Sequence, residues 1–173
     1  MKKIFSTLAI LVIITASKNV NAQQNDATAF NKPGIQSTLL LSTESSPKVD
    51  AADVNTKAVK DFNRSFKNIS GEQWYKVSDG FIASFKENET ETKVAYDQKG
   101  RWHCTVRTFG ENQLPSDVRD LVKSRYYDFK ILVVYEIKHD NTVYILKMED
   151  ASTLKTLRVA DGEIEIIADN TRG

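Results

Sequence analysis

Hydrophobic and polar positions alternate along the chain in two different rhythms, and the first rhythm is that of a helix. Apolar side chains recur every four positions at Val54, Ala58, Phe62 and Phe66, with basic side chains on the other faces. This spacing predicts an amphipathic helix that begins near residue 53 and buries one stripe. Either Asp50 or Asp53 can cap its start.

A second helix is predicted after Pro115. Proline suits the first position of a helix, and an apolar stripe that includes Val118 and Val122 follows it. Asp117 lies near the predicted start and Lys123 comes later, which is the charge order that the helix dipole favours. The helix signals in this region therefore agree with one another.

The second rhythm alternates apolar and polar residues with a period of two, as half-buried strands do. Four such runs follow each predicted helix, and turn signals such as Ser78-Asp79-Gly80 separate them. The strands are expected at 74–77, 81–86, 92–96, 101–109, 129–138, 142–148, 153–159 and 163–168. Because short turns join successive runs, the pattern predicts antiparallel meanders.

The order of one helix and then four strands occurs twice, at residues 53–110 and 111–168. The sequence therefore predicts an α+β fold, a tandem repeat of helix plus four-stranded antiparallel meander within one domain at 53–173. Residues 23–52 are rich in Gln, Asn, Ser and Thr, which predicts a flexible N-terminal segment. Within it, the run Leu39-Leu40-Leu41 is either a short docking strand or an isolated apolar patch.

Residues 1–22 have the pattern of a secretory signal peptide. Lys2 and Lys3 precede an apolar run that ends at Ala16, and small residues precede an expected cleavage after Ala22. The run is shorter than the roughly 20 residues that span a membrane. No cysteine follows it to carry a lipid. The mature chain is therefore predicted to begin at Gln23 and to be periplasmic or secreted, neither membrane-spanning nor a lipoprotein.

Net charge narrows the possible partners. The formal charge of +1 becomes −2 once the three lysines of the predicted signal peptide are removed. A near-neutral chain lacks the positive surface that phosphate neutralisation needs, which argues against a nucleic acid as the partner. Cys104 is the single cysteine, so an intramolecular disulfide is impossible.

A set of apolar positions and turn glycines recurs at particular spacings. They are Phe62-x3-Phe66, Trp74, Gly80-Phe81-x-Ala83-x-Phe85, Val94-x-Tyr96-Asp97-x2-Gly100, Leu114-Pro115-x2-Val118, Tyr126-x2-Phe129-x-Ile131, Val143-Tyr144-x-Leu146 and Asp161-Gly162. This set resembles the PepSY-like, β-lactamase-inhibitor-like proteins that Bacteroidetes export. The resemblance implies tandem helix-plus-meander units, an exported setting and no known catalysis. It does not imply that a β-lactamase is the target.

His103 and Cys104 are the residues that most invite a catalytic or metal-binding interpretation. Neighbours on a strand point to opposite faces, so the two cannot share one metal ion or form a thiol and base pair. Alternation places Cys104 with Trp102 and Val106 on the apolar face, which predicts a buried structural cysteine. The other histidine, His139, lies at a turn. No metal site is therefore predicted.

Other signs of catalysis are also missing from the sequence. It contains neither a Gly-x-Ser-x-Gly elbow nor a Gly-rich phosphate loop. Carboxylates in the turns, such as Asp79, Asp97, Asp140 and Asp161, are best explained as turn formers. The sequence therefore predicts no enzyme and no cofactor.

One helix per meander can cover only one face of a sheet, so the other face is solvated or bound by a partner. In the first unit that face is expected to carry Tyr75, Val77, Ile82, Lys86, Lys93, Arg101, His103 and Arg107. Four of these are predicted to form a partner-binding face: Tyr75, Arg101, His103 and Arg107. In the second unit it is expected to carry Leu132, Val134, Glu136, Val143, Ile145 and Ile167. The apolar members of this second set indicate either contact with the other half or a protein-binding patch.

The sequence thus predicts a non-catalytic exported binding module that contacts an unidentified protein, in the envelope or outside the cell, through an open sheet face. Inhibition of a hydrolase is one form that such binding can take. An alternative is a carrier that holds a small apolar ligand between the halves. A third class is an enzyme with a carboxylate-based site, which would need a cleft with perturbed carboxylates.

Overall fold

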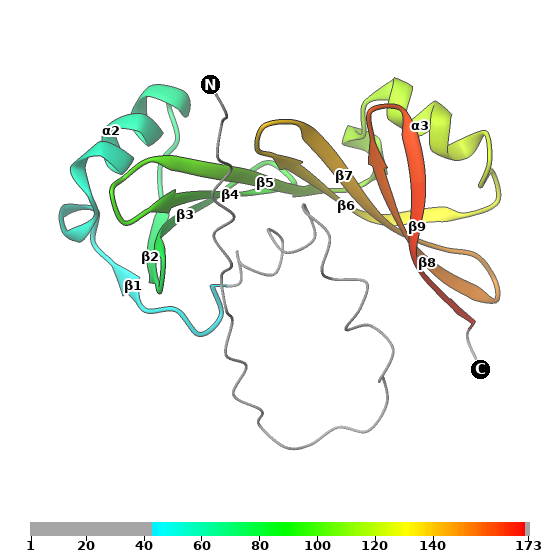
Figure 1. The fold of residues 1–173 in the computed structure, drawn as a ribbon, viewed down its shortest axis with the longest axis horizontal. Helices are drawn as coiled ribbons and strands as arrows, with labels where there is room; N and C mark the ends of the chain where they lie inside the picture. Colours follow the sequence, from blue (N-terminus) through cyan, green and yellow to red (C-terminus); the bar gives the residue numbers. More distant parts are fainter. Residues whose placement is uncertain (1–42, 172–173) are drawn as a thin grey trace, which may run out of the picture.

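The computed structural model describes residues 43–171, which form one antiparallel sheet with two α-helices on the same side of it (Figure 1). The described strands lie side by side in chain order, from β1 to β9. The elements of the first half are β1 (Lys48–Val49), a 3-10 helix (Ala51–Asp53), α2 (Thr56–Ser65), β2 (Gln73–Val77), β3 (Gly80–Glu87), β4 (Thr90–Asp97) and β5 (Trp102–Phe109). Those of the second half are a 3-10 helix (Glu111–Gln113), α3 (Ser116–Lys123), β6 (Lys130–Lys138), β7 (Thr142–Glu149), β8 (Thr153–Ala160) and β9 (Glu163–Thr171).

The two predicted helices and eight predicted strands are all present, and most strand ends fall within one or two residues of the expected positions. The expected α+β class is confirmed. The two halves are not separate meanders, however, because β5 pairs with β6 from Thr105–Lys138 to Phe109–Val134. The sheet is continuous across the junction, and the tandem repeat stays a prediction.

One strand lies where the sequence predicts a flexible segment. Lys48 and Val49 pair with Tyr75 and Trp74 of β2, which adds β1 to the edge of the sheet. The run Leu39-Leu40-Leu41 and the predicted signal peptide lie outside the described residues.

The start of α2 is fixed by a residue that the sequence analysis did not name. Asn55, rather than Asp50 or Asp53, caps the helix, because its side-chain oxygen accepts a hydrogen bond from the Lys57 amide at 3.0 Å. The Asn55 side chain also donates to the Gln98 carbonyl at 3.1 Å. Asp50 and Asp53 instead lie at the two ends of the preceding 3-10 helix.

The turn between β4 and β5 packs directly against this cap. Gly100 has a positive φ of 74°, and a Cβ placed on it would lie 2.5 Å from the Asn55 side-chain oxygen. Only glycine fits both the conformation and the space. The turn is therefore held beside the first turn of α2.

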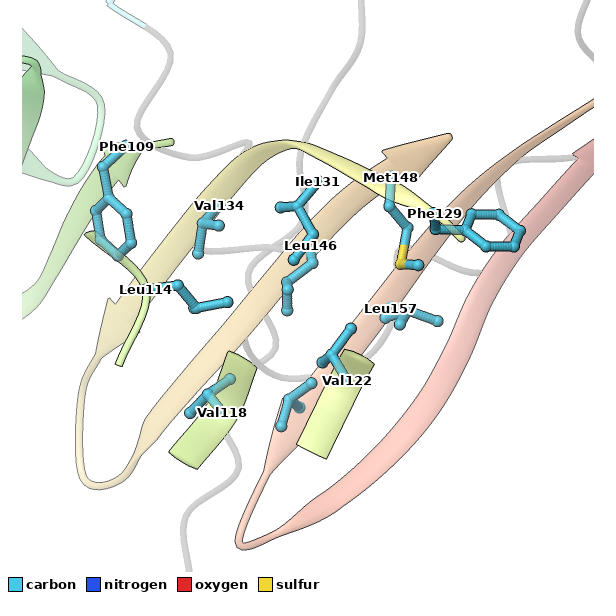
Figure 2. Packing of buried hydrophobic residues seen from close by; sticks show 11 residues of the cluster. Phe109, Leu114, Val118, Val122, Phe129, Ile131, Val134, Leu146, Met148 and Leu157 are labelled. Atoms are coloured by element: carbon cyan, nitrogen blue, oxygen red, sulfur yellow. The ribbon is translucent and has the colours of Figure 1, made fainter. Parts of the chain in front are cut away.

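Each helix covers its own hydrophobic cluster. Under α2 the cluster is built around Phe62, whose ring lies 5.2 Å from Phe66, 5.4 Å from Trp74 and 5.7 Å from Phe85 between centroids. Under α3 the cluster is mostly aliphatic, and Val118 and Val122 of the helix point toward Leu146 and Leu157 of the sheet (Figure 2).

Candidate binding surface

A third hydrophobic cluster lies on the face of the sheet opposite the helices. Ile82 alternates with Phe81 and Ala83, which belong to the α2 cluster, so its side chain points to the other face. The strand pairs Tyr75–Ile82 and Ala95–Cys104 place their members on this same face. We call it the open sheet face, and its apolar members are Tyr75, Val77, Ile82, Ala95, Cys104, Val106, Tyr135, Ile137, Val143, Ile145 and Ile167.

This cluster joins the two halves of the chain. Ile137 and Ile145 from the second half pack in one cluster with Ile82 and Cys104 from the first. Of the two explanations for the apolar face of the second half, contact with the other half is therefore observed. Ile82 and Ile137 are only 1% exposed. The accessible apolar part of the face consists of half-buried side chains packed against this cluster: Tyr75, Val77, Ala95, Tyr135, Val143 and Ile167.

A groove of about 530 Å³ continues this face toward the junction of the two halves. Polar and charged side chains line much of it, including Gln73, Ser84 and Glu91. Leu132 lines its other side and is 40% exposed, because a β-bulge between Ile131 and Val133 leaves it outside the regular register. The groove thus combines an exposed leucine with hydrogen-bonding groups.

Of the predicted partner-binding face, Tyr75 lies on the open sheet face. Arg107 lies on the helix side, so its predicted placement is wrong. Its guanidinium donates to Glu136 at 2.8 Å and lies 5.4 Å from the Phe109 ring centroid. The prediction assumed that the apolar residues of β5 face a helix, whereas Cys104 and Val106 face the open side. Val134 and Glu136, also expected on the open side, lie on the helix side with Arg107.

Glu136 is a buried carboxylate at the junction of the halves, 6% exposed. Besides Arg107, it accepts a hydrogen bond from the Tyr144 hydroxyl at 3.4 Å and lies 3.4 Å from the Lys138 ammonium. Burial raises the pKa of Tyr144, and the Glu136 charge raises it further. The group links β5, β6 and β7 on the helix side.

Arg101 and His103, the other two predicted members, lie around an exposed tryptophan at the start of β5. Trp102 is 42% exposed, and its indole N–H donates to the Thr105 hydroxyl at 3.0 Å. The pairing of β4 with β5 skips His103, so this bulge places Trp102 and Thr105 on the helix side while Cys104 faces the open side. Unbroken alternation predicts Trp102 and Cys104 on one face, and the bulge is the reason that they lie on opposite faces.

The two histidines are neighbours in the fold, although 36 positions separate them in the sequence. Their ring centroids are 5.0 Å apart, and the His139 ring stacks at 6.2 Å on Trp102. A ring nitrogen of His139 also bonds the His103 carbonyl. We call Arg101, Trp102, His103 and His139 the Trp102 cluster. Only the pairing of β5 with β6, which the sequence analysis did not anticipate, brings it together.

Arg101 is fixed in this cluster by Asp97. Its guanidinium Nε donates to the Asp97 carboxylate at 2.6 Å, and the backbone amides of Lys99 and Arg101 each donate to the same carboxylate at 2.9 Å. Burial alone would raise the pKa of Asp97, but these hydrogen bonds and the Arg101 charge outweigh it and hold the pKa below its ordinary value. Asp97 is thus a turn former, as expected.

Cys104 is a buried thiol, as predicted, although it faces the open side. It is 2% exposed, and burial raises its pKa to about 11, so the thiol is protonated at neutral pH. Within residues 43–171 no group of three or more His, Cys, Asp or Glu side chains is placed to hold a metal ion. No helix in that range is long and apolar enough to cross a membrane.

The arrangement of helices and sheet has counterparts among solved proteins of Bacteroides. A DUF2874 family protein of Bacteroides uniformis matches with a TM-score of 0.53 at 16% identity, over 67% of this chain and 88% of that chain. A BLIP-like protein of Bacteroides fragilis matches with a TM-score of 0.55 at 16% identity, over 69% of this chain and 89% of that chain. The fold is BLIP-like.

A third protein with this BLIP-like fold, from Bacteroides eggerthii, is assigned provisionally to the periplasm. It matches with a TM-score of 0.53 at 11% identity, over 68% of this chain and 88% of that chain. No protein-family model matches the sequence, and no curated protein does. The resemblance noted in the sequence is thus confirmed at the level of the fold.

Proposed function

We propose that this chain is a non-catalytic, exported binding module that contacts a protein through its open sheet face. The observation that carries the proposal is that this face bears apolar side chains from both halves and that neither helix covers it. Tyr75 and Tyr135 are half-buried on this face, and the exposed Leu132 lines the groove that continues it. Aromatic side chains of this kind are enriched at protein interfaces.

Export is the second part of the proposal. The signal-peptide pattern of residues 1–22 supports it, as does the provisional periplasmic assignment of a protein with the same fold. We propose cleavage after Ala22, which gives a periplasmic or secreted chain that starts at Gln23 and carries no lipid. The partner is then an envelope or extracellular protein, and inhibition of a hydrolase is one form the contact can take.

A carrier of small apolar ligands is less well supported. The cavity of about 380 Å³ at the junction of the halves is lined partly by Phe66 and Ile69. Lys67, Glu87 and Arg107 also line it, and such charged side chains do not suit an apolar ligand. The charged lining of this cavity thus argues against the carrier, and the binding module remains the better supported proposal.

Cross-linking in the native envelope tests the open sheet face. The exported protein with both Tyr75→Ser and Leu132→Ser should lose its cross-linked partner, because truncating a central interface side chain weakens binding about ten-fold or more. Tyr127→Ser is the matched control, because Tyr127 is 82% exposed and belongs to no hydrophobic cluster of the described residues. If the double variant keeps its denaturation midpoint and still captures the same partner, the open sheet face is not the contact.

A further inference from the structure

A pocket of about 420 Å³ lies on the helix side of the sheet, opposite the open sheet face, between α2 and the turn that precedes β5. It is lined by Lys57, Lys60, Asp61, Arg64, Gly100, Arg101 and Trp102. The contact between Gly100 and the Asn55 cap holds the turn against the helix and so fixes the two walls relative to each other. We call it the Trp102 pocket.

The walls of the Trp102 pocket carry more positive than negative charge. Arg64 is bound to Asp61 at 2.5 Å, and Arg101 to Asp97 at 2.6 Å. Lys57 and Lys60 are exposed on α2 and form no ion pair with any of residues 43–171. Two cations are therefore held by carboxylates, and two are left to attract an anion.

The aromatic wall is held in place before any partner arrives. The Trp102 indole is fixed on one side by the hydrogen bond to Thr105 and stacks on His139. It nevertheless keeps 42% of its surface exposed. An exposed aromatic ring that is already ordered loses little conformational entropy on binding, which is the property of an interface hot spot.

We propose that the Trp102 pocket binds an acidic segment of a protein partner, with carboxylates at Lys57 and Lys60 and an apolar side chain against Trp102. This surface lies on the helix side, so the proposal is independent of contact through the open sheet face. Charge complementarity favours an anionic occupant, since Lys57 and Lys60 lie on one helix face with no carboxylate partner among residues 43–171.

A protein segment fits better than a phosphate polymer. The carboxylate of Asp61 lines the same pocket and would repel a continuous row of phosphates. An acidic peptide can place its glutamates at the lysines and an apolar residue on the indole.

Iodide quenching of fluorescence gives a direct readout. The chain has two tryptophans, and Trp74 is only 3% exposed, so the quenchable emission comes from Trp102. The probe is a peptide of about ten residues with glutamates and leucines spaced by glycines. Its counterpart has glutamine in place of each glutamate. We expect the acidic probe to protect Trp102 and to bind about ten-fold more tightly than the glutamine probe at low salt, with the difference shrinking in about 1 M salt.

Charge variants locate the binding. Lys57→Gln with Lys60→Gln should weaken the acidic probe about ten-fold or more in a titration calorimeter. Arg125→Gln with Lys130→Gln is the matched control, because it removes two exposed cations elsewhere and should leave the affinity unchanged. Tyr75→Ser with Leu132→Ser should also leave it unchanged, which separates this proposal from the open sheet face.

Four results would overturn the proposal. One is equal binding of the glutamate and glutamine probes, and another is equal loss in the pocket and control charge variants. The third is tighter binding of a single-stranded oligothymidine of similar length than of the acidic peptide, which would identify a phosphate polymer as the preferred occupant. Failure to bind the acidic probe at millimolar concentration would also contradict it.

Discussion

The two halves use the same arrangement of a helix over a sheet but fill it with different side chains. Under α2 the buried volume comes largely from aromatic rings gathered around Phe62. Under α3 it comes from a larger number of aliphatic side chains such as Val122, Leu146 and Leu157. In this chain the same helix-over-sheet arrangement is therefore filled in two different ways.

The two clusters also differ in the polar groups that they contain. Aromatic residues bring polar groups into the α2 cluster: the Tyr96 hydroxyl reaches Asp61 at 3.3 Å, and the Trp74 indole N–H is buried without a partner. Burial and the Asp61 charge raise the pKa of Tyr96 well above its ordinary value, which keeps the hydroxyl protonated. The aliphatic α3 cluster contains few such groups, so the two clusters should respond differently to substitution.

Truncation in the α2 cluster should have the largest effect on stability. Phe62→Ala should lower the free energy of unfolding by about 3 to 5 kcal/mol, because Phe62 is 2% exposed and touches three other rings. Val122→Ala, in the equivalent place on α3, should lower it by only about 2 kcal/mol, since two methyl groups are lost. Urea denaturation of both variants measures the difference. Equal losses would mean that the aromatic cluster contributes no more to stability per truncated side chain than the aliphatic cluster does.

Phe66→Ala serves as the control within the same helix. The sequence pattern places Phe66 on the buried stripe with Phe62, but Phe66 is the C-cap residue and is only half-buried. Its loss should therefore cost about 1 to 2 kcal/mol. A cost as large as that of Phe62→Ala would show that the end of α2 is packed more tightly than its exposure indicates.

The junction between the halves should give the next largest effect. Glu136→Ala removes a buried carboxylate that is bound to Arg107, and should lower the free energy of unfolding by about 2 kcal/mol. This loss is smaller than for a fully buried ion pair, because the Arg107 side chain is 39% exposed and water can solvate it once it is unpaired. If calorimetry shows the two halves of the Glu136→Ala variant unfolding in separate steps, then Glu136 is what couples their unfolding in the wild type. A single transition at lower temperature would show that it stabilises them as one unit.

Periodicity alone was enough to predict the two α-helices and all the described strands except β1, because each side chain's exposure follows the alternation within its own segment. The binding surface required longer-range information. The bulge at His103 reverses the alternation for Trp102, and the pairing of β5 with β6 places His139 beside it. Neither a bulge nor a pairing of distant strands leaves a mark in local residue spacing. Arg107 was placed on the wrong face because the apolar residues of β5 were expected to face a helix, whereas Cys104 and Val106 face the open side.

The unpaired indole of Trp74 gives a smaller and more discriminating test of the aromatic cluster. Trp74→Phe removes a buried donor that has no acceptor, which should raise the free energy of unfolding by about 1 kcal/mol. The smaller ring packs less well, which should lower it by about the same amount. We expect a net change within about 1 kcal/mol of zero in urea denaturation. A loss above about 3 kcal/mol would mean that the N–H is satisfied in solution.

The smallest expected effect compares the acidic turns of the two halves. Asp97 accepts bonds from two backbone amides in the β4–β5 turn, and Asp150 from those of Ser152 and Thr153 in the β7–β8 turn. The pKa of each carboxyl is lowered. For Asp97, burial raises the pKa, but the hydrogen bonds and charge of Arg101 outweigh this effect. For Asp150, the hydrogen bond from the Ser152 amide is the largest cause. A carboxyl whose folded-state pKa is depressed stabilises the protein above its unfolded pKa of about 3.9, and this stabilisation is lost as the pH falls through the folded value.

The consequence is a stability difference that depends on pH. Asp97→Asn should reduce the free energy of unfolding by less than about 1 kcal/mol at pH 7, because solvent screens much of the Arg101 pair, and by less still near pH 3. Asp150→Asn should change stability with the same sign and the same pH dependence. Urea denaturation across this pH range measures both variants. If the Asp97 variant differs more from the wild type at pH 3 than at pH 7, the carboxyl is not ionised in the folded turn. If only Asp97→Asn also weakens the acidic probe, its grip on Arg101 helps to shape the Trp102 pocket, a role that the Asp150 turn in the other half does not share.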